Sequence, residues 1–137
     1  MYISELTIKN YRGFRNLTVN FRDGINLIIG QNNSGKSNIL NALALIFDSF
    51  AKKRLTIDDF NINIPLQELK EHSPSIIIGV SIKQSENEDI MSDDLVTVSN
   101  WLTNLNYPYT AKIQYEFFLP ENYNAPHCQD SFLAFLS

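Results

Sequence analysis

The sequence predicts an α/β domain built on a mixed sheet, which is antiparallel at its start and carries one central helix. Several segments alternate apolar and polar residues with the two-residue period of strands. Residues 37–50 have helical spacing, and a glycine-rich loop joins this helix to a short apolar run before it. The length of 137 residues is that of one domain at most.

Composition excludes several classes of protein. Hydrophobic residues make up 44% of the chain and charged residues 19%, which excludes a wholly disordered polymer. Cys128 is the only cysteine, so no intrachain disulfide is possible. No apolar run is long enough to span a membrane, and the first residues do not form a signal peptide. We therefore expect a cytoplasmic protein without a membrane partner.

The first half of the chain predicts three strands. Residues 2–9 and 17–22 alternate, as half-buried strands do. Asp23 and Gly24 then form a hairpin turn signal. Residues 25–29 are nearly all apolar, which is typical of a strand that is buried on both faces. This third strand is expected to run directly into Gly30.

The helix at 37–50 is expected to be covered on more than one side. Its apolar positions share one face and widen around it: Ile39, Leu40, Leu43, Ile46, Phe47 and Phe50.

Residues 55–74 read as polar and irregular. A strand is predicted at 76–82, a helix with Ser92 as its N-cap and apolar positions up to Leu105, and a strand at 109–119.

Charge is distributed unevenly along the chain, whose net charge is -4. Residues 1–54 hold eight basic and three acidic side chains, whereas residues 55–137 hold three basic and twelve acidic ones. The net charges of the two parts are therefore +5 and -9. A phosphate-bearing ligand is expected in the positive part.

Eight consecutive residues carry the chemistry, and they are Gly30, Gln31, Asn32, Asn33, Ser34, Gly35, Lys36 and Ser37. They fit the phosphate-loop pattern GxxxxGK[ST]. Glycines allow successive backbone N–H groups to surround a phosphate, and the helix N-terminus adds partial positive charge. Lys36 would reach the β- and γ-phosphates, while the Ser37 hydroxyl would complete the shell of a Mg²⁺ ion. The expected cofactors are ATP and Mg²⁺.

The opening strand, the segment NYRGF at 10–14 and the loop GQNNSGKSN resemble the N-terminal lobe of RecF/SMC-like, ABC-type ATPases. Within that group the sequence looks most like the OLD-family ATP-dependent endonucleases, some of which act in anti-phage defence. The resemblance covers residues 1–50 and extends weakly to about residue 83. It implies that Arg12 lies near the phosphates, although a surface arginine is the alternative. Asn33 would orient the loop or the attacking water, or act only as a spacer.

Hydrolysis requires a second acidic residue on Mg²⁺, and no such residue, signature loop or nuclease acid is identified in this chain. We find no catalytic residue. The chain therefore reads as one partial domain, 1–137, in which 120–137 is the tail of an interrupted element. The resemblance implies a head-to-head dimer or larger assembly, with DNA as substrate of the complete enzyme. Alternatives are a RecF- or SMC-like DNA repair ATPase without nuclease, or a non-hydrolysing nucleotide-binding switch.

Overall fold

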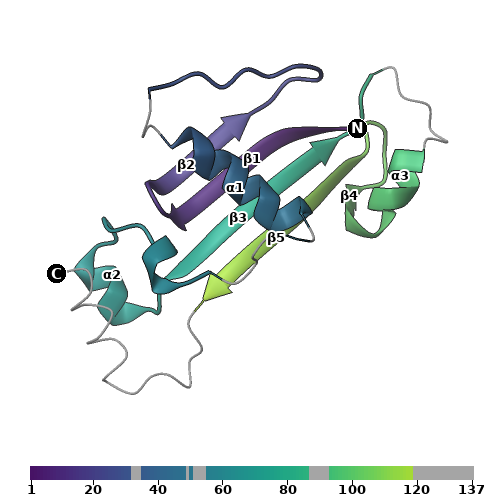
Figure 1. Ribbon diagram of the computed structural model, residues 1–137. Helices are drawn as coiled ribbons and strands as arrows, with labels where there is room; N and C mark the ends of the chain where they lie inside the picture. The colour runs from purple at the N-terminus through teal and green to yellow at the C-terminus, as the bar shows by residue number, and fades with distance from the viewer. Residues whose placement is uncertain (32–34, 49, 51–54, 87–92, 119–137) are drawn as a thin grey trace.

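The computed structural model describes residues 1–31, 35–48, 50, 55–86 and 93–118 (Figure 1). Its centre is a five-stranded sheet with the order β2-β1-β3-β5-β4. The strands are β1 (Tyr2–Tyr11), β2 (Phe14–Asn20), β3 (Ser75–Lys83), β4 (Leu102–Asn104) and β5 (Thr110–Phe118). The helices are α1 (Lys36–Phe47), α2 (Leu66–Glu71) and α3 (Asp93–Val98), with 3-10 turns at Ile57–Asp59 and Ser99–Trp101.

Every strand pair described is antiparallel, so the prediction of a mixed sheet is wrong for this part of the chain. The antiparallel opening was predicted correctly, but its hairpin joins β1 to β2 through Arg12 and Gly13. Asp23 and Gly24 form a bend that leads into no strand. Residues 25–29, predicted as a third strand, form no strand and pair with none of the others.

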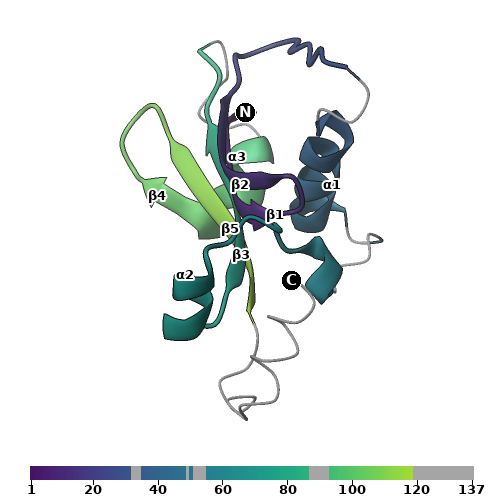
Figure 2. The same cartoon turned by 90° about the vertical axis from the view of Figure 1, so that its left-hand side faces the viewer.

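The three long strands alternate as their sequences predict. Opposite partners such as Ile8 and Ile78 place buried side chains on one face of the sheet. Leu6 and Val80 extend this row. Helix α1 lies against that face, crossing the strands (Figures 1 and 2). Burial of these aliphatic side chains, at about 1.5–3 kcal/mol each, holds the helix and sheet together.

Helix α1 is buried on one side only, in contrast to the expectation of cover on several sides. Its buried residues are Ile39, Ala42 and Leu45, whereas Leu40 is 63% exposed. The helix ends before Asp48, so Phe50 lies beyond it and is exposed. Among the described helices, none has the length and apolarity needed to cross a membrane.

Residues 25–29 were predicted to form a strand buried on both faces, and this prediction is wrong. The segment is irregular and arches from the end of β2 to the start of α1 (Figures 1 and 2). Ile25, Leu27 and Ile29 are 101%, 80% and 82% exposed. A strand that is apolar on both faces needs neighbours on both edges, and residues 25–29 belong to none of the strands of the described sheet.

The later elements differ from prediction in two places. The segment expected to be irregular, 55–74, contains the Ile57–Asp59 turn and α2. The helix expected to reach Leu105 stops at Val98, after which Leu102 enters β4 and pairs with Ala111 of β5. Strands β3 and β5 were predicted within one or two residues of their bounds. Ser92 and the tail 120–137 lie outside the described residues.

Candidate functional site

The structure places the second half of the glycine-rich loop at the start of α1. Gly35 is the N-cap residue, and Lys36 and Ser37 are the first two residues of the helix. Gly30 and Gln31 are exposed and irregular in the segment before it. Asn32, Asn33 and Ser34 lie outside the described residues. The predicted order of loop and helix is therefore correct, although no strand precedes the loop.

Gly35 occupies a position that only glycine fits. Its φ of 93° lies in the left-handed region, which side chains of L residues rarely adopt. A Cβ atom on Gly35 would also lie 2.5 Å from Cζ of Phe14 and 2.9 Å from its Cε1. The aromatic ring at the start of β2 therefore packs directly against the second glycine of the motif. The sequence pattern alone does not predict this role of Phe14, although Phe14 closes the NYRGF segment.

The first turn of α1 leaves donors available for an anion. The N–H groups of Asn38 and Ile39 donate to the Gly35 carbonyl, at 3.0 and 3.2 Å. The N–H groups of Lys36 and Ser37 come before them and have no acceptor within the helix. Together with the partial positive charge of a helix start, they fit a phosphate group.

The Lys36 ammonium donates a hydrogen bond to the carbonyl oxygen of Gly30, the first glycine of the motif. Because Lys36 stands near the end of the loop and Gly30 at its beginning, this contact brings the ammonium group close to both ends of the loop. A phosphate oxygen in the same place would accept the proton more strongly than a neutral carbonyl does, because charged hydrogen bonds are stronger. The described residues of the loop therefore fit the triphosphate expected from the motif.

Arg12 lies in the two-residue turn between β1 and β2, where Asn10 and Arg12 have positive φ values of 58° and 48°. Hydrogen bonds to the Arg12 backbone from a distant segment hold this turn. The Arg12 N–H donates to the Asp59 carbonyl at 2.7 Å, and Nδ2 of Asn61 donates to the Arg12 carbonyl at 2.7 Å. Residues 59–61 thus stabilise the positive-φ backbone conformation of Arg12, which is unfavourable for an arginine without such hydrogen bonds.

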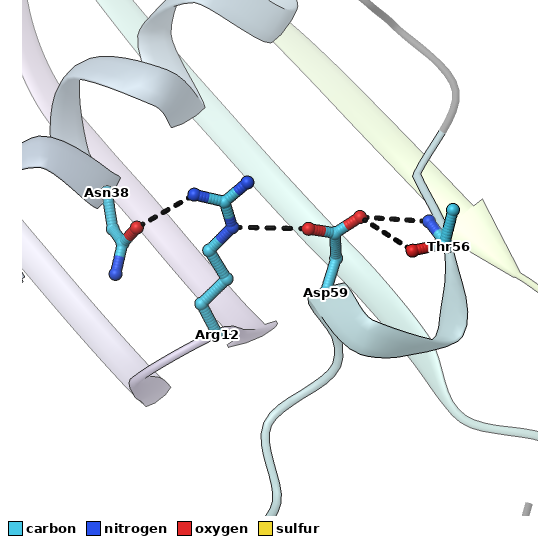
Figure 3. A network of polar contacts seen from close by, with 4 residues as sticks. All are labelled: Arg12, Asn38, Thr56 and Asp59. Atoms are coloured by element: carbon cyan, nitrogen blue, oxygen red, sulfur yellow. Dashed lines mark hydrogen bonds and ion pairs between the residues drawn. The ribbon is translucent and has the colours of Figure 1, made fainter.

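The Arg12 side chain points from this turn toward the start of α1 (Figure 3). Nε donates to Oδ1 of Asp59 at 3.2 Å, and Nη1 donates to Oδ1 of Asn38 at 3.0 Å. Asn38 follows Ser37 directly in the helix. The structure therefore places Arg12 beside the residue that follows the loop, and the side chain is 39% exposed there.

Asp59 is occupied on both oxygens. Oδ1 accepts from Arg12, while Oδ2 accepts from the backbone N–H of Thr56 at 2.9 Å and from its hydroxyl at 3.4 Å. Asp59 therefore holds Arg12 with one oxygen and Thr56 with the other. In the part of the chain that the structure describes, no group of three or more potential metal ligands gathers. Nearby, burial raises the pKa of Tyr11, an effect that Arg12 opposes and Asp59 reinforces.

The chain matches the protein family described as "AAA ATPase domain" over residues 1–130. It is also 41% identical over 59 residues to the DNA replication and repair protein RecF of Bacillus cytotoxicus. RecF of Bacillus thuringiensis and RecF of Bacillus cereus match with the same identity and length. These alignments cover 43% of this chain, and the chain spans 15% of the length of these relatives.

Proposed function

Because the chain belongs to the AAA ATPase domain family, we propose that residues 30–37 bind ATP together with Mg²⁺. The observation that carries the proposal is the placement of Gly35, Lys36 and Ser37 at the N-terminus of α1. The helix amides would bind phosphate oxygens, and Lys36 would exchange its bond to Gly30 for one to the triphosphate. Mg²⁺, held in part by the Ser37 hydroxyl, would neutralise phosphate charge.

A titration of the 137-residue chain with fluorescent mant-ATP and Mg²⁺ tests this proposal. Lys36→Ala should weaken binding by about ten- to a hundred-fold, which is the expected cost of a charged hydrogen bond. Ser37→Ala should weaken binding only when Mg²⁺ is present. Leu40→Ala, an exposed change further along the same helix, is the matched control and should bind as the wild type does. Equal affinity of the wild type and Lys36→Ala would remove the proposal.

We further propose that the chain binds ATP without turning it over by itself. Of the described acidic residues near the loop, Asp59 has both oxygens engaged by Arg12 and Thr56. The second acid for Mg²⁺ would come from outside the described residues, among which no group of three or more potential metal ligands gathers. Phosphate release measured with malachite green should equal that of Lys36→Ala. Turnover that disappears in the mutant would contradict this.

At the level of biological role, we propose that the lobe belongs to an ATPase that acts on DNA. The likeness to RecF favours a DNA repair ATPase, whereas the resemblance of residues 1–50 to OLD-family enzymes favours an ATP-regulated endonuclease. The two differ in whether a nuclease accompanies the lobe. Incubation of supercoiled plasmid with the complete native protein, Mg²⁺ and ATP separates them, because only the endonuclease would produce nicked or linear DNA.

A further inference from the structure

Three segments that are distant in sequence meet at the Arg12 guanidinium. Arg12 comes from the β1–β2 turn, Asn38 from the first turn of α1, and Asp59 from the 3-10 turn at Ile57–Asp59 (Figure 3). The guanidinium lies between two acceptors, Oδ1 of Asn38 and Oδ1 of Asp59. We propose that Asp59 is a positioning residue: with Asn38 it holds Arg12 beside α1 so that the free edge of the guanidinium meets a bound phosphate. This inference rests on the proposed ATP binding.

The count of donors supports this role. A guanidinium has five N–H groups in a fixed plane. Asp59 takes the one on Nε and Asn38 takes one on Nη1, which leaves three. Nη2 has no hydrogen-bond partner among the described residues, and the Arg12 side chain is 39% exposed. The edge that remains is the kind that binds a phosphate through two parallel hydrogen bonds.

Asp59 is itself held in place, which is what a positioning residue requires. Its second oxygen accepts the N–H and hydroxyl bonds of Thr56, and its side chain is only 17% exposed. An arginine held at two points has already lost most of its rotamer freedom, so binding a phosphate costs less entropy. In an Asp59→Asn variant the charge that holds Nε is lost, and Arg12 must be ordered when the ligand binds.

The Asp59 carboxylate can be changed without removing the hydrogen bonds that hold the Arg12 backbone. The Asp59 carbonyl accepts the Arg12 N–H, and Asn61 binds the Arg12 carbonyl. Neither bond involves the Asp59 side chain. Asp59→Asn is therefore expected to fold with the β1–β2 turn intact. Glu68→Gln is the matched control, because it removes a carboxylate that pairs with Arg15, the other arginine of the same hairpin.

The experiment is a mant-ATP titration with Mg²⁺ on the full chain, with inorganic tripolyphosphate as competitor. Asp59→Asn should weaken both ligands by about two- to ten-fold, from the cost of ordering one long side chain. Asp59→Glu should recover part of the loss, and Glu68→Gln should bind as the wild type does. In an Arg12→Ala background, Asp59→Asn should produce no further loss. A merely structural role for Asp59 would not depend on Arg12 in this way.

Three results would overturn the inference: binding by Asp59→Asn that equals or exceeds wild-type binding, a loss that persists in the Arg12→Ala background, or an equal loss in Glu68→Gln. Circular dichroism checks that each variant is folded, and if Asp59→Asn is not, Asp59→Glu in the two backgrounds decides. Failure of the wild type to bind would remove the proposed function and this inference with it. Wild-type binding that Lys36→Ala abolishes but Asp59→Asn leaves intact would overturn only the inference.

Discussion

Replacement of Gly35 by alanine should destabilise the protein more than the same change at Gly13 or Gly24. Two effects combine at this position. The φ of 93° is unfavourable for an L residue, at about 1–2 kcal/mol. The new Cβ would also lie 2.5 Å from Cζ of Phe14, so the packed ring must move, at about 1–3 kcal/mol. The sum is about 2–5 kcal/mol.

Urea denaturation followed by circular dichroism measures this loss. With an m value of about 2 kcal/mol/M, the midpoint should fall by about 1–2.5 M. The chain contains two matched controls. Gly24 has a φ of 100° with nothing within 4 Å of an added Cβ, so Gly24→Ala reports the conformational cost alone. Gly13 has neither feature, and Gly13→Ala should be nearly neutral.

A double-mutant cycle with Phe14→Ala isolates the steric part. With the ring absent, Gly35→Ala should cost no more than Gly24→Ala, so the coupling between Gly35 and Phe14 should be about 1–3 kcal/mol. If Gly35→Ala costs the same as Gly24→Ala in the wild-type background, the ring does not restrain the loop. The reasoning about Phe14 would then be refuted.

Three further predictions follow from burial and charge. Ile78→Ala, at a side chain with no exposed surface, should lower the free energy of unfolding by about 2–5 kcal/mol in urea denaturation. Leu27→Lys, at an 80% exposed position, should change it by less than about 0.5 kcal/mol; a large loss would mean that residues 25–29 are packed in solution. The raised pKa of Tyr11, caused first by burial, means that its contribution to stability is complete below pH 10.0, the ordinary pKa, and is lost as the pH rises through the folded-state pKa. Urea midpoints of the wild type should therefore fall more steeply above about pH 10 than those of Tyr11→Phe, and parallel curves would contradict this.

The sequence was sufficient for features that depend on near neighbours. Alternation along 76–82 and 109–119 placed β3 and β5 correctly, because the two faces of a strand differ in burial at every step. The motif located the start of the helix to within one residue, Ser37 predicted and Lys36 observed, since a positive-φ glycine and a helix N-terminus are both local requirements. The resemblance implied that Arg12 lies near the phosphates; the structure places its side chain against Asn38, and the contact with phosphate stays a prediction.

Other features were decided by the tertiary structure. Residues 25–29 have the composition of a buried strand, but a strand forms only where it pairs with another backbone edge, and residues 25–29 belong to no strand of the described sheet. The bond between Arg12 and Asp59 joins residues 47 positions apart, and the contact of Phe14 with Gly35 crosses from a strand to a loop. Periodicity reports which face of an element is apolar. The packing of the whole chain decides which distant atoms contact that face.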